Sequence, residues 1–352
     1  NLRHEETLKS YDFGHGHPEL YSTQLKEPER GKNASDWYRV NPHRLHLGII
    51  GFDGVKKSQI SNIDQTLDMW SGTVTSDFKV DSHPVKVMTA CHPDRDMISA
   101  EITSAAHLPV VFRMPYPTGA HADDACDWTR DSLHITEVVR SGSNSALLRH
   151  TLDDTSYYIN VSWTGNVTPE VKGRNEWVLR PSSDTWSFTA EFTPAESAAG
   201  VTVAADVRKE STRYWDYFWR SGGVVDFSKC TDPRAAELER RVVLSQYLLA
   251  TQCAGSTPPQ ETGLTYNSWF GKFHLEMIWW HQAQFALYGH ENLLARTLPW
   301  YETVMPIARE IARRQGFEGV RWMKMTDPSG IEAPSKVGSF LIWQQPHLIY
   351  LA

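Results

Sequence analysis

The stretch that decides the fold of this chain is Asn267–His281, which reads NSWFGKFHLEMIWWH. After one intervening predicted helix, a second stretch of the same character follows at Gly316–Pro334, GFEGVRWMKMTDPSGIEAP. Acids, bases and indole rings are interleaved in both stretches at a density that an ordinary core does not need. Charged groups set among Trp and Phe must be paired, shifted in pKa or used on a ligand. Aromatic faces beside carboxylates are typical of a sugar site, because rings stack on the apolar face of a pyranose.

Length and composition predict a soluble globular protein with room for two domains, since 352 residues are 40% hydrophobic and 22% charged. The net charge of −7 argues against nucleic acid or an anionic membrane as partner. No run of about 18 apolar residues occurs, so no membrane span is expected. Fourteen tryptophans indicate either large cores or a carbohydrate-binding surface, and both interpretations stay open. Sequons at Asn33, Asn160 and Asn166 favour a secreted or periplasmic protein.

Residues 1–208 are predicted to form an antiparallel β-sandwich domain. In the run 157–163, Tyr, Ile, Val and Trp share one face and polar residues the other, and the run 186–193 alternates in the same way. Residues 201–207 continue this alternation. Further strand-like runs lie near 45–50, 73–80, 85–90, 97–103, 109–114 and 133–139, with turn residues between them.

The pattern changes to helical after residue 208. Residues 209–231 are predicted to be an aromatic-rich linker helix, and residues 232–352 to be a helical domain. Helices are expected from 232, over about 274–288, over about 291–315 with a kink or split at Pro299 and Pro306, and from about 338. Arg313 and Arg314 look like part of a solvated helix face. Because the last helix is still apolar at 348–351, we expect that residue 352 is not the natural end.

The two opening stretches supply the candidate site residues. Glu332 follows a turn and is the candidate catalytic acid, although it could equally be a charge at a helix N-terminus. Asp327 precedes a proline and is more typical of a turn, yet it is kept as a candidate contact. The other candidate substrate contacts are Trp269, His274, Glu276, Arg321, Trp322 and Lys324. The alternative for the tryptophans is core packing. His274 and Glu276 have no third ligand at suitable spacing, so neither a metal nor another cofactor is expected.

Two motifs in these stretches resemble a known group of enzymes. Phe273-His-Leu-Glu276 is similar to the Trp-Asp-Thr-Glu element of family 65 glycoside hydrolases and phosphorylases, with His274 in place of Asp. Gly316–Lys324 resembles their Gly-Tyr-x-Gly-x-Arg-Phe-Pro-Trp segment, with departures at Met323 and Lys324. The order of a β-sandwich, an aromatic linker and helices resembles the same clan, the six-hairpin glycosidases. The resemblance implies a divergent member with a β-sandwich, a helical linker and the first part of an (α/α)6 toroid.

The resemblance also implies an inverting mechanism on an α-glycosidic bond of an oligosaccharide. One carboxylic acid protonates the leaving oxygen while a second activates water, the two lying roughly 6.5–9.5 Å apart. Glu332 falls at the acid's place, with a pKa expected to be raised by indole neighbours, and the base would lie beyond residue 352. About 120 residues follow Thr231, fewer than the ~180–200 that twelve helices and their loops need. A disaccharide phosphorylase and a non-catalytic carbohydrate-binding homologue remain the alternatives, and a homodimer is compatible with the sequence.

Overall fold

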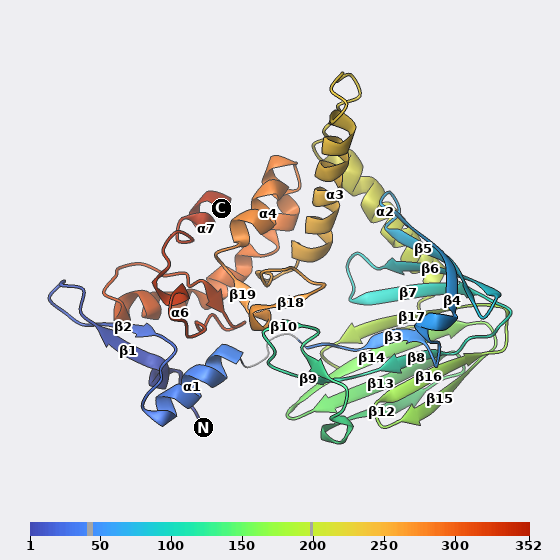
Figure 1. Ribbon diagram of the computed structural model, residues 1–352, viewed down its shortest axis with the longest axis horizontal. Helices are drawn as coiled ribbons and strands as arrows, with labels where there is room; N and C mark the ends of the chain where they lie inside the picture. Colours follow the sequence, from blue (N-terminus) through green and yellow to red (C-terminus); the bar gives the residue numbers. More distant parts are fainter. Residues whose placement is uncertain (41–44, 198–199) are drawn as a thin grey trace. The chain divides into compact units, whose positions relative to one another are not determined.

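The computed structural model describes residues 1–40, 45–197 and 200–352, which form two compact units (Figure 1). The β unit contains His46–Tyr116 and Cys126–Arg220. The helical unit contains Asn1–Leu45, Pro117–Ala125 and Ser221–Ala352. The chain is therefore a multidomain β and α protein. Its division differs from the predicted boundaries, because two segments that the sequence assigns to the sandwich belong to the helical unit.

The β unit is built from two antiparallel sheets (Figure 1). The larger has the strand order β12-β13-β14-β17-β7-β6-β5-β4. Its strands are β4 (Ile60–Asp68), β5 (Thr73–Val80), β6 (His83–Cys91), β7 (Met97–Thr103), β12 (His134–Ser141), β13 (Ser145–Leu152), β14 (Thr155–Thr164) and β17 (Thr185–Thr193). The smaller has the order β15-β16-β8-β3, with strands β3 (Ile49–Phe52), β8 (Val110–Arg113), β15 (Val167–Gly173) and β16 (Glu176–Pro181).

The core of the β unit lies between the two sheets. The apolar residues of β14 that the alternation assigned to one face are all buried. Ring contacts join the sheets: Phe112 of β8 lies 5.6 Å from Phe188 of β17, and Trp163 of β14 lies 6.1 Å from Trp177 of β16. The predicted sandwich is thus confirmed, and period-2 alternation identified its inner face correctly.

The outer face of β17 is covered by residues 201–203, part of a segment that the sequence predicted to be another strand. Residues 201–203 are not in a strand, and helix α2 begins at Ala204 and ends at Ser221. Thr189 of β17 donates to the carbonyl of Thr202, and Glu191 is buried in a bidentate pair with Arg95. Only four apolar residues make up the alternation over 201–207, too few to distinguish the two-residue period of a strand from the period of a helix. In the structure, the buried positions of α2 recur every three or four residues.

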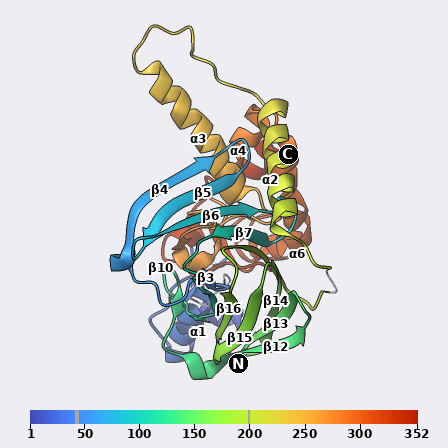
Figure 2. The ribbon, with the colours of Figure 1, turned by 90° about the vertical axis from the view of Figure 1, so that its right-hand side faces the viewer.

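Helix α2 is bound to the β unit along its length. Figure 2 shows it beside β4, β5, β6 and β7. Arg208 pairs with Glu101 of β7 at 2.7 Å, and Ser211 donates to the carbonyl of Ser71 in the β4–β5 turn. Near its end, the indole nitrogen of Trp219 donates to the carbonyl of Met69. These bonds anchor the β4–β5 turn to the helix.

The helical unit contains α3 (Ala235–Cys253), α4 (Ile278–Leu287), α5 (Glu291–Ala295), α6 (Leu298–Arg314) and α7 (His347–Leu351). The helix expected over 291–315 is split into α5 and α6, with Pro299 in the first turn of α6 and Pro306 inside it. The helix expected from 338 is a short 3-10 turn, Gly338–Phe340, followed only later by α7. No helix within the described ranges has the length and apolarity that a membrane crossing requires.

The N-terminal segment packs within the helical unit, contrary to the predicted division. It forms a 3-10 turn (His4–Thr7), the hairpin of β1 (Leu8–Tyr11) and β2 (Glu19–Ser22), and helix α1 (Glu29–Val40). Tyr21 stacks on Phe340 at 4.7 Å, and the hydroxyl of Ser339 donates to the carbonyl of Ser22. The segment 117–125 contributes β10 (Ala122–Asp123), which pairs with β18 (Asn267–Ser268). Such long-range pairings leave no local pattern in the sequence.

Replacing Gly72 with alanine should destabilise the β unit. Gly72 has φ +63°, and a Cβ atom there would lie 2.2 Å from the indole nitrogen of Trp215 and 2.7 Å from the hydroxyl of Ser211. We expect a loss of about 2 kcal/mol or more in urea unfolding, because strain and a clash add. Gly54→Ala is the control, since Gly54 has φ +73° with nothing within 4 Å. It should lose only ~1 kcal/mol; equal losses would contradict the clash.

Candidate active site

A short strand pairing brings the two polar-aromatic stretches together. β19 (Phe273–His274) pairs antiparallel with β20 (Met325–Thr326), and the amide of Leu275 donates to the carbonyl of Lys324 at 2.9 Å. This register sets two oppositely charged side chains beside one another. Nζ of Lys324 lies 2.9 Å from Oε1 of Glu276, and both side chains are mostly buried. Two candidates that are 48 positions apart in the sequence therefore form one ion pair.

The ammonium of this ion pair lies over the indole ring of Trp269. Nζ of Lys324 lies 4.5 Å from the ring centroid, within cation–π range. The guanidinium of Arg39 lies 6.0 Å from the same centroid, and the ring of His121 lies 4.8 Å away. The indole is partly exposed. We call Arg39, Trp269, Lys272, His274, Glu276 and Lys324 the Trp269 cluster. It combines an aromatic face with charged hydrogen-bonding groups, which suits recognition of a sugar.

Backbone geometry fixes the indole. Trp269, Phe270 and Gly271 have φ of +48°, +63° and +68°, so three successive residues are left-handed. A non-glycine residue rarely adopts this region, at a cost of about 1–3 kcal/mol each. The turn is held by the β10–β18 pairing and by the amide of Phe270, which donates to the carbonyl of His121. Strain of this kind concentrates at functional sites, which supports a ligand-binding role for Trp269.

The cluster also contains two bases whose pKa values are lowered by burial. Lys272 is 1% exposed and donates to the carbonyl of Tyr38 at 2.9 Å. Burial lowers its pKa to about 7, helped by the charge of Arg39 and opposed by Asp327. His274 is fully buried, and burial, with Lys324 nearby, lowers its pKa to about 3. His274 is therefore neutral at neutral pH, and its Nε2 faces Oε2 of Glu261 at 3.5 Å.

Glu332, the predicted acid, bridges to Thr326 of β20, and its side chain lies in a buried ion pair. It is 1% exposed, and its carboxylate contacts the guanidinium of Arg314. The guanidinium stabilises the charged carboxylate, whereas a general acid must hold a proton and reach the substrate. Arg314 is likewise not solvated as predicted, because its side chain is 9% exposed.

Asp327 has the turn role that its position before Pro328 suggests. Its Oδ1 accepts bonds from the amides of Ser329 and Ile331 and from the hydroxyl of Ser329. These bonds close the hairpin that pairs Thr326 with Glu332. Asp327 also acts electrostatically on Lys272 and opposes the lowering of its pKa, so it contributes charge to the cluster.

Arg321 and Trp322 have structural contacts. Arg321 donates to the carbonyls of Ser339 and Leu341, and burial lowers its pKa. Trp322 is 6% exposed in the core of the helical unit, with its ring 5.0 Å from that of Tyr301. These contacts fit the core-packing alternative for Trp322 and an anchoring role for Arg321.

The structure thus gathers Trp269, His274, Glu276 and Lys324, and leaves Glu332, Arg321 and Trp322 in buried structural contacts. Sequence reasoning missed Arg39, His121 and Glu261. Glu261 lies in a loop just before the first stretch, so its position could have suggested it. Arg39 and His121 reach Trp269 only through long-range packing, which no local sequence pattern predicts. Within the described ranges, no three His, Cys, Asp or Glu side chains are grouped as metal ligands.

Comparisons with known proteins give a likeness of fold. No family model and no curated protein matches the sequence. A solved structure described as "Putative kojibiose phosphorylase from human microbiome" matches with a TM-score of 0.57 and 11% sequence identity. The match covers 94% of this chain and 46% of that chain. The chain therefore spans about half the length of this neighbour and shares its fold over that half.

Lys272→Met should flatten the pH dependence of stability. In the folded protein the pKa of Lys272 is about 7, against an ordinary 10.5. Between these values the unfolded chain binds more protons, so the charge of Lys272 makes stability rise with pH across this window. The advantage of the variant should be largest below about pH 7 and vanish towards about pH 10.5. Urea unfolding across this range measures it. Lys336→Met, at an exposed lysine, is the control and should leave the slope unchanged.

Breaking the Glu332–Arg314 pair should be strongly destabilising. Glu332→Gln leaves a buried guanidinium unpaired, which typically costs about 3–5 kcal/mol. Arg314→Met combined with Glu332→Gln should lose less than the sum of the single losses, with a coupling of about 1 kcal/mol or more in a double-mutant cycle. The exposed pair Glu310–Arg313 is the control, and Glu310→Gln should cost at most ~1 kcal/mol. Additive losses at 314 and 332 would show that the pair is not coupled.

Proposed function

We propose that this protein is a carbohydrate-active enzyme that cleaves an α-glycosidic bond of an oligosaccharide, with the Trp269 cluster in its sugar-binding site. The observation that carries the proposal is the partly exposed indole of Trp269 under the Lys324–Glu276 ion pair. An indole face binds the apolar face of a sugar ring, and the flanking carboxylate and ammonium bind its hydroxyls. The shared fold with a sugar phosphorylase structure supports this assignment.

We further propose that α3 to α7 are the first part of an (α/α)6 toroid. Short connections join α4, α5 and α6, as neighbouring helices of such a toroid need, while longer segments separate α3 from α4 and α6 from α7. The coverage of 46% of the neighbour fits an arrangement in which the opposing half of the site lies outside residues 1–352. On this proposal the base carboxylate, or the phosphate-binding group that replaces it, comes from that other half.

The proposed reaction is an inverting one, which requires an acid on one side of the glycosidic oxygen. Glu332 would serve only if it left Arg314 and became accessible. Glu276 is better placed to contact a sugar, because its carboxylate belongs to the Trp269 cluster. We therefore propose Glu276 as a substrate contact and keep the acid role of Glu332 as a prediction. Secretion also stays a prediction; Asn33 and Asn166 are exposed, whereas the amide nitrogen of Asn160 is buried.

Phosphorolysis is the second candidate, and two observations favour it. The neighbour is described as a phosphorylase. In addition, the cluster holds the cations Arg39 and Lys324 beside the partly exposed indole of Trp269. Arginine and lysine are the side chains that bind phosphate. Hydrolysis and phosphorolysis differ only in the nucleophile, water or phosphate, so one assay separates them.

The test is an assay of the full-length protein on aryl α-glucosides and on kojibiose, with and without inorganic phosphate. We expect cleavage, and release of glucose 1-phosphate only if phosphorolysis is the reaction. Trp269→Ala and Glu276→Gln should raise KM by roughly tenfold or more, the effect of losing a central contact. Trp37→Ala, at an exposed indole outside the cluster, is the control and should match the wild type. Unchanged kinetics in both cluster variants would overturn the proposed site.

Glu332→Gln separates the two roles of Glu332 in the same assay. If kcat falls by orders of magnitude while the urea midpoint is unchanged, Glu332 is the acid. If stability falls while kcat of the folded fraction is retained, Glu332 is a buried charge partner, which the ion pair with Arg314 leads us to expect. An inert wild type that still binds disaccharides would instead support a non-catalytic carbohydrate-binding protein.

A further inference from the structure

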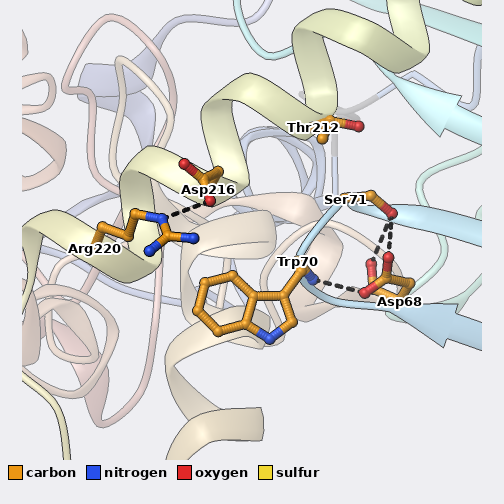
Figure 3. A pocket seen from close by; sticks show the side chains of 6 residues that line it. All are labelled: Asp68, Trp70, Ser71, Thr212, Asp216 and Arg220. Carbon is orange, nitrogen blue, oxygen red and sulfur yellow. Dashed lines mark hydrogen bonds and ion pairs between the residues drawn. The ribbon is translucent and has the colours of Figure 1, made fainter.

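The β unit has a pocket of its own, shown in Figure 3. Its volume is about 390 Å³, within the rough range of 300–1,000 Å³ for small-molecule sites. The β4–β5 turn and helix α2 line it, through Asp68, Trp70, Ser71, Thr212, Asp216 and Arg220. None of these residues belongs to the Trp269 cluster, so the pocket is a separate feature.

An exposed indole forms one wall of this pocket. Trp70 is 56% exposed, and its ring contacts that of Trp219 at 6.3 Å in a tilted arrangement. Large apolar side chains exposed beside polar groups in a concave site often mark binding. The turn that carries the indole does not depend on it for anchoring, because the bonds to Ser211 and Trp219 come from the backbone of Ser71 and Met69.

The backbone around Trp70 is held firmly. Asp68 accepts the amide of Trp70 through Oδ1 at 3.0 Å and the hydroxyl of Ser71 through Oδ2 at 2.7 Å (Figure 3). Gly72 packs directly against Trp215. A turn fixed at both ends presents its indole in a constant position, so little ordering is needed on binding. This pre-organisation distinguishes Trp70 from an indole on a loose loop.

The polar wall opposite the turn comes from α2. The guanidinium of Arg220 lies 5.7 Å from the centroid of Trp70, and its Nε donates to Oδ1 of Asp216 at 2.7 Å. The side chain of Arg220 is 70% exposed, so a ligand in the pocket can reach its guanidinium. Thr212 adds a hydroxyl that donates to the carbonyl of Arg208 and can accept a bond.

These charges restrict the class of ligand. A strongly anionic ligand would meet Asp68 and Asp216, and a cationic one would compete with Arg220 for the indole face. A neutral molecule with an apolar face and several hydroxyls satisfies both the ring and the charged groups. Sugar rings have this chemistry. We propose that the pocket at Trp70 is a carbohydrate-binding site for a neutral glycan, separate from the site of cleavage.

The proposal does not require the activity proposed above, since a protein can bind a glycan here whether or not it cleaves one. The test is affinity electrophoresis of the full-length protein in gels that contain soluble starch, dextran or xylan, with maltoheptaose titration as a second measurement. We expect retardation by at least one of these neutral glycans. Trp70→Ala should weaken binding at least tenfold, while Trp70→Phe should retain most of it because the ring face remains.

Two controls separate this site from the Trp269 cluster and from nonspecific effects. Tyr217→Ala removes an exposed ring from the same helix without touching the pocket, and should bind like the wild type. Trp269→Ala should keep the retardation, while its KM for cleavage rises as predicted above. Equal retardation of the wild type and Trp70→Ala, or no retardation by any of the glycans, would overturn the proposal. A change of oligomeric state in Trp70→Ala with unchanged glycan binding would also overturn it and show a protein contact.

Discussion

The candidate site depends on one short contact, the pairing of Phe273–His274 with Met325–Thr326. Two residues on each strand are a small unit by themselves, and isolated pairs of strands are marginal in water. Here the pair is continued by the bond from Leu275 to Lys324 and is supported by the core around Trp300 and Trp322. Because the register is fixed there, Lys324 faces Glu276 and lies on Trp269. A slip by one residue would turn these side chains to the opposite face.

Burial of charge is the second constraint on the helical unit. Lys272, Glu276, Arg321 and Glu332 are all buried, and each has a partner among the described residues. Such groups specify one arrangement more than they stabilise it, because desolvation offsets much of the gain. The long segment between α6 and α7, residues 315–346, is therefore held by polar contacts as well as by apolar packing. This explains why a segment with little regular secondary structure still has a defined conformation.

Short-range periodicity in the sequence was enough to predict strands and their buried faces. The buried face of β14 and the positions of most strands were predictable, because alternation is a local property. The membership of residues 1–45 and 117–125 in the helical unit was not, since it rests on pairings such as β10 with β18. Arg313 and Arg314 show the same limit at a single position. They are adjacent on one helix, yet Arg313 is exposed and Arg314 is buried against Glu332, and only the fold separates them.

The tryptophans show most clearly that the structure distinguishes core residues from exposed ones, which composition cannot do. Composition alone left large cores and a carbohydrate surface as equal interpretations. Trp163 and Trp177 lie between the sheets, and Trp322 lies in the helical core, so they have apolar neighbours. Trp70 and Trp269 differ because each keeps an exposed or partly exposed face beside a cation that is itself paired with a carboxylate. An indole, a cation and a carboxylate meeting at an accessible surface are more than packing requires. The β unit has a further instance at Trp128, where the guanidinium of Arg113 lies 5.0 Å from a partly exposed ring and pairs with Glu176. The arrangement alone therefore does not identify a binding site. Trp70 is distinguished by the pocket that it lines, and Trp269 by its left-handed backbone.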